Sequence, residues 1–229
     1  MENAGPLITP TLGYKRIILF TEIKMYHLEV FDEWNAIHPE DLWVYNKLFL
    51  NTRLGYLCGP AGCPVSISGD YIVRPSINLL GMGRYSRIET LEKNTEHLHP
   101  AEFWSEIFTG THYSVDFRNK KSELVVVGEK SEDDPLYKWK KWTKIDMNFD
   151  FPEILNDVKG DYEWINCEFI GNKLIEVHFR RNPNFRYGNT FAIPVWEGEK
   201  IEEKKNIKFI EAKEYHRIGF YIDLGIGTP

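Results

Sequence analysis

The feature that most constrains this chain is a strand-like stretch, residues 174–184, that carries charge along one side. Its apolar residues favour a pleated and partly buried strand, which ends at Pro183 because proline cannot donate to a ladder. Since successive side chains alternate along a strand, Glu176, His178 and Arg180 are expected on one face. Burying so much charge costs free energy, so this face is expected to bind something.

A second carboxylate is expected close to the first. Glu168 lies on the preceding apolar run, and the tight turn predicted at residues 171–173 would bring it beside Glu176 in a hairpin. Two neighbouring carboxylates stay ionised only when a cation offsets their repulsion, which indicates a divalent metal ion. The competing interpretation is a solvated outer face on which Glu176 pairs with Arg180, and for an arbitrary hairpin it is the favoured one.

Composition sets broad limits on the protein. Its 229 residues are 42% hydrophobic, which is typical of a globular protein with a sizeable core. The net charge of −6 argues against bulk attraction to nucleic acid or to an anionic membrane. No apolar run is long enough to cross a bilayer and no secretory leader is recognisable, so we expect a cytoplasmic protein. The cysteines lack zinc-like spacing, and Cys167 is expected in the core.

The order of predicted elements indicates an α+β chain with a sheet-rich centre. A helix is predicted at residues 41–50, where Asp41 is placed to cap its start, and others at residues 22–37 and 151–158. Short apolar or alternating runs predict the strands. These runs are residues 15–20, 71–75, 87–91, 103–108, 112–117, 124–127, 207–210 and 218–222.

Two motifs in the first half of the chain could contact a phosphate. Arg74 stands at the end of a predicted strand, directly before a proline. The Gly81-Met82-Gly83 turn that follows can expose backbone amides to a phosphate, although such a turn is more often simply part of a hairpin.

A third segment, from Lys138 to Lys144, interleaves basic and aromatic residues. This composition is used to stack on the bases of single-stranded nucleic acid. In an acidic protein we favour a strand edge or a lid over a bound phosphate, so a nucleic-acid partner is not expected.

Taken in order, the motifs between residues 41 and 183 resemble those of the ATP-grasp superfamily. Its members hold ATP between two subdomains and usually join a carboxylate to an amine, a thiol or a similar nucleophile through an acyl phosphate. The resemblance implies an α+β fold in which two small α+β subdomains with largely antiparallel sheets enclose a nucleotide cleft. It implies an N-terminal segment (1–40) that is reduced relative to typical ligases, a first subdomain with the hinge (41–110) and a second subdomain with the metal-site hairpin (111–229).

The resemblance assigns five residues to the nucleotide. Arg74 matches the basic residue that touches an ATP phosphate, where the family usually has lysine, and Lys47 matches the lysine of the first subdomain's helix. Gly81 and Gly83 match the glycine loop over the phosphates. Residues 103–110 resemble the hinge strand that reads adenine, which makes Glu106 the implied adenine contact.

The resemblance also implies a magnesium site. Glu168 and Glu176 match the two acidic ligands, and His178 stands where the family usually has an asparagine ligand. Imidazole is a poorer partner for magnesium than oxygen is, so Asn182 is the candidate that replaces the missing amide. His112 stands where many relatives have another acid.

The implied function is that of a ligase-like enzyme that activates a carboxylate through an acyl phosphate, with ATP and Mg²⁺ as cofactors. Lys47, Arg74 and either Arg180 or Arg181 would offset the developing negative charge. The substrate is an unknown carboxylate or amine, and one of the two arginines would hold its carboxylate. Because the N-terminal segment is short, a protein partner or a second copy of the chain could complete the acceptor site. The alternative is a catalytically inactive binding or assembly protein with the same fold.

Overall fold

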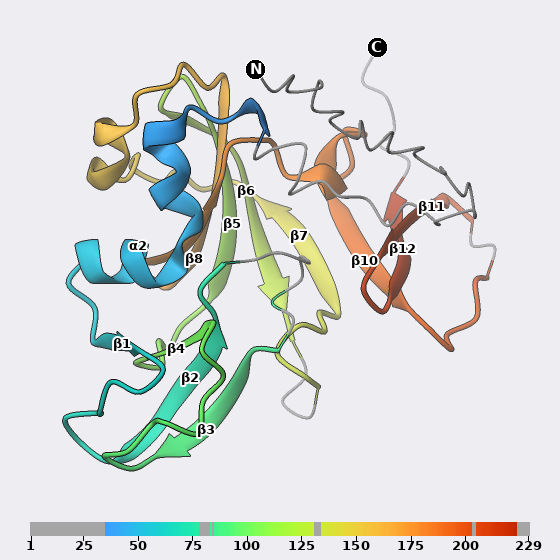
Figure 1. The fold of residues 1–229 in the computed structure, drawn as a ribbon. Helices are drawn as coiled ribbons and strands as arrows, with labels where there is room; N and C mark the ends of the chain where they lie inside the picture. The colour runs from blue at the N-terminus through green and yellow to red at the C-terminus, as the bar shows by residue number, and fades with distance from the viewer. Residues whose placement is uncertain (1–34, 78–82, 84, 131–133, 203–204, 224–229) are drawn as a thin grey trace, which may run out of the picture.

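The part of the chain that the structure describes forms two antiparallel sheets and a few short helices (Figure 1). The structure is a computed structural model that describes residues 35–77, 83, 85–130, 134–202 and 205–223. The predicted strand at residues 15–20 and most of the predicted helix at residues 22–37 lie outside these residues. None of the helices in the described part is long and apolar enough to cross a membrane.

The smaller sheet has four strands in the order β1-β4-β2-β3. Tyr71, Val73 and Trp104 lie on one face and pack in a small apolar core. Alternation turns the neighbouring Arg74 and Ser105 to the other face. The strands are β1 (Cys58–Pro60), β2 (Gly69–Pro75), β3 (Arg87–Leu91) and β4 (Glu102–Ser105).

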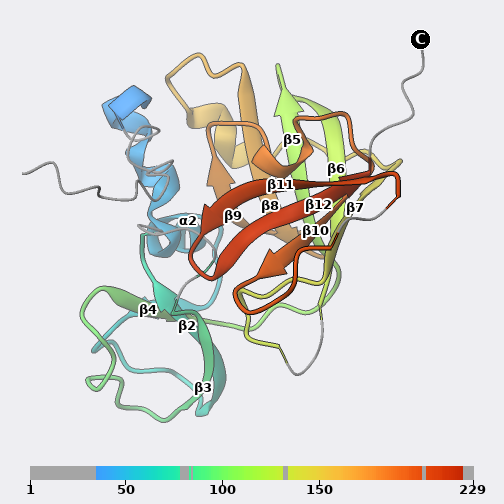
Figure 2. The ribbon, with the colours of Figure 1, turned by 90° about the vertical axis from the view of Figure 1, so that its right-hand side faces the viewer.

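The larger sheet has eight strands in the order β11-β12-β10-β7-β6-β5-β8-β9, and Figure 2 shows β10, β11 and β12 at one end of it. Its strands are β5 (His112–Arg118), β6 (Lys121–Glu129), β7 (Lys141–Ile145), β8 (Trp164–Ile170), β9 (Lys173–His178), β10 (Phe191–Trp196), β11 (Ile207–Glu214) and β12 (Arg217–Asp223). All neighbouring pairs are antiparallel. The sheets and short helices therefore confirm the predicted α+β class.

Four short helices that lie wholly within the described residues flank the sheets: η1 (Pro39–Tyr45), α2 (Lys47–Arg53), η2 (Glu153–Asp157) and η3 (Pro183–Phe185). Val44 and Leu50 from the first two pack with Val115, Cys167 and Val177 of the larger sheet. α2 also contacts β1, so it lies between the two sheets (Figure 1). Cys167 is fully buried, as predicted.

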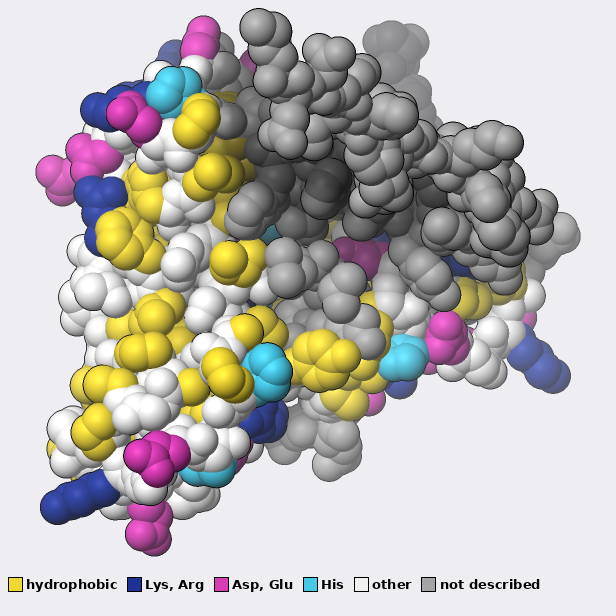
Figure 3. Space-filling model, in the orientation of Figure 1, with side chains coloured by type: hydrophobic (Ala, Val, Ile, Leu, Met, Phe, Trp, Pro, Cys, Tyr) yellow, Lys and Arg dark blue, Asp and Glu magenta, His cyan; other side chains and the backbone are white. Residues whose placement is uncertain are grey.

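Exposed hydrophobic side chains gather at the end of the molecule that holds α2 and the smaller sheet (Figure 3). Phe49, Leu57, Ile67 and Ile88 are among the large exposed examples from this region. Scattered exposed hydrophobic residues are normal for a folded protein.

Three details of the predicted elements are wrong. The helix predicted at residues 41–50 is two helices, separated at Asn46, whose side chain caps α2 by accepting a hydrogen bond from the Phe49 amide at 3.0 Å. Asp41 is not a cap, because its carboxylate turns away to another segment. The basic and aromatic stretch is not a strand edge, since β7 pairs with both β6 and β10.

Asp41 is a buried anchor between η1 and the loop before β8. Its carboxylate accepts hydrogen bonds from the Lys159 amide at 2.8 Å, the Gly160 amide at 2.7 Å and the Tyr162 hydroxyl at 2.9 Å. Burial works against its ionisation, but these three donors outweigh that effect and lower its pKa. The anchor fixes η1 against the larger sheet.

We expect Asp41→Ala to lower the free energy of unfolding by about 3 kcal/mol, because each buried donor left without an acceptor costs roughly 1–3 kcal/mol. Urea denaturation followed by circular dichroism measures the change. Glu40→Ala, one residue away and exposed, is the matched control and should alter stability little. Equal effects from the two substitutions would contradict the anchoring role.

Candidate functional site

One face of the larger sheet is lined with polar side chains where β5, β8 and β9 lie side by side. Ser114 stands opposite Glu168, and Glu168 stands opposite Glu176. Residues opposite one another on paired strands point to the same face, and so do residues two apart on one strand. We call this surface the polar face, and it comprises His112, Ser114, Asp116, Asn166, Glu168, Glu176 and His178.

A β-bulge places Glu176 and His178 on the polar face. Lys173 pairs with Ile170 and Leu174 with Phe169, so the turn itself contains only Gly171 and Asn172. The pairing then skips Ile175 and resumes with Glu176 opposite Glu168. Without this extra residue, Glu176 would point to the apolar face, since a shift of one residue reverses every side chain.

Lys47 and Arg74 bring positive charge to the polar face from outside the larger sheet. Lys47 is the first residue of α2, and its amide donates to the Ser76 carbonyl at 2.7 Å, which ties the helix to the end of β2. Its ammonium lies 3.0 Å from a Glu176 carboxylate oxygen. Arg74 on β2 is also buried, and Glu176 and Glu168 act on its charge.

Glu168 and Glu176, which we call the acidic pair, each have a basic neighbour. His178 Nε2 lies 3.2 Å from Glu176 Oε1, and His112 Nε2 lies 3.1 Å from Glu168 Oε2. Burial opposes the ionisation of Glu176, but the charge of Lys47 and the hydrogen bond from His178 outweigh it and hold the pKa of Glu176 well below its usual value. Glu176 is therefore a carboxylate that is largely withdrawn from solvent and stays ionised.

Arg74 is a buried cation of this group. Burial disfavours its ionised form and lowers its pKa, although Glu176 and Glu168 partly offset that effect. Its Nε atom has no hydrogen-bond partner among the described residues, and its guanidinium lies 5.2 Å from the centre of the Phe103 ring. A buried donor without an acceptor is suited to bind an anionic ligand.

Asp116 is a member of the polar face that sequence reasoning missed. Asn166 Nδ2 and the Asn182 amide donate to its Oδ1 at 2.8 and 2.9 Å, whereas its Oδ2 has no partner among the described residues. Burial raises its pKa despite these two bonds. The alternation of His112, Ser114 and Asp116 along β5 was the available signal, since three polar residues share one side of a strand.

Asn182 is used to build the segment that follows β9. Its side chain donates to Ser114 Oγ at 3.1 Å and accepts from the Asn184 amide at 3.0 Å, which caps η3. Arg181 is exposed, and its guanidinium lies 4.4 Å from the centre of the Trp164 ring. Arg180 is half-buried and donates to the Arg181 carbonyl at 3.2 Å.

Three further residues, Gly81, Gly83 and Glu106, were assigned to the nucleotide. Gly81 is outside the described residues, and Gly83 has a φ of +60°, which suits a turn. Glu106 directly follows β4, where its carboxylate accepts a hydrogen bond from the Leu57 amide at 2.9 Å. It therefore closes the connection between α2 and the smaller sheet.

The described residues contain no group of three or more His, Cys, Asp or Glu side chains arranged to hold a metal ion. Glu168 and Glu176 nevertheless face the same side from neighbouring strands. Magnesium usually takes only one or two carboxylates from the protein and completes its shell with water and substrate phosphates. The acidic pair fits that requirement.

We expect acid to destabilise the protein through Glu176. A carboxylate whose pKa is lowered by folding contributes stability that is full above its unfolded pKa and is lost as the pH falls through its folded pKa. Urea unfolding should therefore show a loss on the order of 2 kcal/mol below about pH 4. The Glu176→Gln variant should show less of this dependence, and an unchanged profile would contradict the assigned ionisation.

Comparison with known proteins adds likenesses of structure. No protein-family model and no curated protein matches the chain. An L-amino acid ligase from Bacillus licheniformis superposes with a TM-score of 0.51 at 10% identity, over 80% of this chain and 67% of the ligase.

Two further solved structures superpose less closely. A proposed ATP-grasp superfamily protein from Archaeoglobus fulgidus gives a TM-score of 0.46 at 12% identity, over 79% of this chain and 64% of that protein. The ATP-grasp ligase PsnB, in complex with a minimal precursor, gives 0.38 at 14% identity, over 63% and 54%. This chain thus spans between about half and two thirds of the length of these proteins. The superposition on the L-amino acid ligase shows that the chain shares that protein's fold, and its two antiparallel sheets with short helices agree with the predicted ATP-grasp-like α+β fold.

Proposed function

We propose that the polar face binds the phosphates of ATP between Lys47 and Arg74. One observation carries the proposal: two buried cations from different parts of the chain, Lys47 and Arg74, act on the carboxylates of the polar face. Buried ion pairs contribute little net stability, because desolvation cancels most of their attraction. A role in folding therefore does not explain this concentration of charge, whereas an anionic ligand does.

Magnesium is part of the same proposal. Glu168 and Glu176 would hold the ion, and its charge would neutralise the phosphates when bound. The ammonium of Lys47 sits at the end of a flexible side chain, so it can exchange its contact with Glu176 for a phosphate oxygen.

The proposed reaction is the activation of a carboxylate by ATP. The substrate carboxylate would attack the γ-phosphorus, ADP would leave, and an amine would then displace phosphate from the acyl phosphate. Such transfer depends on positioning and charge stabilisation, which Lys47 and Arg74 are placed to give. Of the two arginines after β9, Arg180 is the better candidate for holding the substrate acid, because Arg181 stacks on Trp164.

A second candidate function is binding or assembly without catalysis. The hydrogen bonds of the Asn182 side-chain amide favour this second function. To replace the asparagine that usually binds the metal ion, this amide would have to break its bonds to Ser114 and Asn184. His178 would then be the third ligand, which suits magnesium poorly.

The domain division belongs to this proposal as well. The two sheets separate between Ser105 and His112, which agrees with subdomains at residues 41–110 and 111–229. A protein partner or a second copy of the chain that completes the acceptor site is part of the same proposal.

Isothermal titration of the full chain with ATP and magnesium tests the proposal. We expect saturable binding that weakens about tenfold in Glu176→Gln, because that variant keeps the shape of the side chain but loses its charge. Glu163→Gln, an exposed carboxylate paired with Arg118, is the control. No ATP binding by the wild-type chain would overturn the proposed site.

Product analysis then separates the two candidate functions. ADP release that depends on an added carboxylate and an amine supports the ligase. ATP binding without ADP formation across a broad panel of acids and amines, with or without added partners, supports the binding protein.

A further inference from the structure

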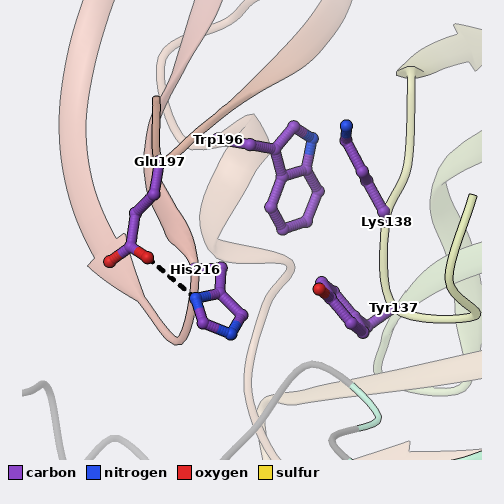
Figure 4. A pocket seen from close by; sticks show the side chains of 5 residues that line it. All are labelled: Tyr137, Lys138, Trp196, Glu197 and His216. Atoms are coloured by element: carbon purple, nitrogen blue, oxygen red, sulfur yellow. Dashed lines mark hydrogen bonds and ion pairs between the residues drawn. The ribbon is translucent and has the colours of Figure 1, made fainter. Parts of the chain in front are cut away.

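A pocket of about 250 Å³ is lined by residues that do not belong to the polar face. Its walls come from the connection between β6 and β7, the end of β10 and the turn between β11 and β12. The residues that line it are Tyr137, Lys138, Trp196, Glu197 and His216 (Figure 4). The residues proposed to bind the nucleotide are not among them, so the pocket requires a separate explanation.

Aromatic rings form much of the pocket wall. The ring centres of Tyr137 and Trp196 are 5.8 Å apart, and those of Tyr137 and Tyr215 are 5.1 Å apart, both edge to face. Trp196 Nε1 donates to the Trp139 carbonyl at 3.3 Å, which fixes the direction of the indole. The rings are therefore held in place before any ligand arrives.

The turn that supplies Tyr215 and His216 is strained. Glu214 pairs with Arg217, and Tyr215 between them has a φ of +52°. Turns of this length favour Asn or Gly at such a position, and a bulky residue there is an outlier. Strain of this kind is commonly retained at ligand sites. Here it brings the Tyr215 ring against Tyr137 and His216.

The charge around the rings is negative. Glu197 Oε2 lies 2.8 Å from His216 Nδ1, so the carboxylate stands at the pocket wall (Figure 4). Lys138 supplies the nearby ammonium, and its Nζ lies 3.6 Å from Asp134 and 3.9 Å from Glu199. Asp134 also acts on the charge of Lys130, so three carboxylates stand against two lysines around the rings, which leaves an excess of negative charge for a cationic ligand to neutralise.

We propose that this pocket binds the guanidinium group of an arginine side chain presented by a peptide. A planar cation stacks on aromatic faces and pairs with a carboxylate, and the pocket provides both. Its volume is below the roughly 300–1,000 Å³ of pockets for drug-sized ligands and suits one side chain. The pocket shares no residue with the proposed nucleotide site, and the proposal does not depend on the function of that site.

Titration of the full chain with N-acetyl-arginine methylamide tests the proposal. The indole N–H signal of Trp196, assigned with Trp196→Phe in a ¹⁵N-tryptophan-labelled sample, reports binding by NMR. We expect a saturable shift that is absent with the norleucine and glutamate analogues of the probe. Glu197→Gln and Tyr137→Leu should weaken binding about threefold to tenfold, and Tyr137→Phe should retain it because the ring is kept.

Glu211→Gln is the matched control, because Glu211 is an exposed carboxylate on β11 that pairs with Lys213 outside the pocket. It should bind the probe like the wild type, and thermal melts verify that each variant is folded. The proposal is overturned by the absence of a saturable shift or by equal binding of the norleucine analogue. Unchanged affinity in Glu197→Gln would overturn it as well.

Discussion

Replacing Lys47 with methionine is expected to lower the free energy of unfolding by about 3 kcal/mol, because it leaves a buried carboxylate without its partner. Lys47 Nζ lies 3.0 Å from Glu176, and both side chains are largely withdrawn from solvent. The same substitution should weaken ATP binding by about tenfold or more, since a charged donor to phosphate is lost. Urea unfolding and isothermal titration measure the two effects.

A double variant separates the two effects of Lys47. Lys47→Met combined with Glu176→Met removes both charges, and replacing a whole buried pair by apolar residues is often neutral. The double variant should therefore regain most of the stability without regaining ATP binding. Lys144→Met, at an exposed lysine of β7, is the control for the loss of one positive charge. A double variant no more stable than Lys47→Met would contradict the pairing energy assigned here.

The predicted acidic hairpin shows how far sequence reasoning reaches. The apolar runs around Glu168 and Glu176 identified both strands, and the structure places the two carboxylates opposite one another. The route differs, because a three-residue turn was predicted and the chain makes a two-residue turn followed by a bulge at Ile175. The extra residue lies in the turn in the prediction and in the bulge in the structure, so both pair Glu168 with Glu176.

Long-range contacts explain what sequence reasoning missed. Asp41 precedes apolar residues on a helical period, the usual pattern of a cap, yet its three donors lie at Lys159, Gly160 and Tyr162. No local pattern reveals partners more than a hundred residues away. Asp116 was missed for a related reason, because its role depends on Asn166 and Asn182 across two other segments.

The prediction of one helix at residues 41–50 was wrong at Asn46, because this residue caps the start of α2. Asn has a weak helix propensity but is among the best caps, so its position was the available signal. The boundary matters for function, because a helix that begins after Asn46 starts at Lys47 and directs that residue toward Glu176.

Arg74→Met is expected to weaken ATP binding without lowering the free energy of unfolding, whereas Lys47→Met should lower both. Arg74 is buried, its Nε has no acceptor among the described residues, and burial lowers its pKa. Replacing such a charge with an apolar side chain of similar length should leave the free energy of unfolding unchanged or raise it by about 1 kcal/mol. ATP binding should weaken by about 10- to 100-fold, because an arginine that contacts phosphate contributes charge-assisted hydrogen bonds.

The measurement for Arg74→Met pairs urea unfolding with isothermal titration, with Arg118→Met as the control. Arg118 pairs with Glu163 at the exposed end of β5, so its loss should change neither quantity much. A large loss of stability in Arg74→Met would mean that the guanidinium compensates Glu168 and Glu176 in the folded protein. Unchanged ATP affinity would remove Arg74 from the proposed site. Lower affinity at full stability would show that the chain retains a costly buried charge for its ligand.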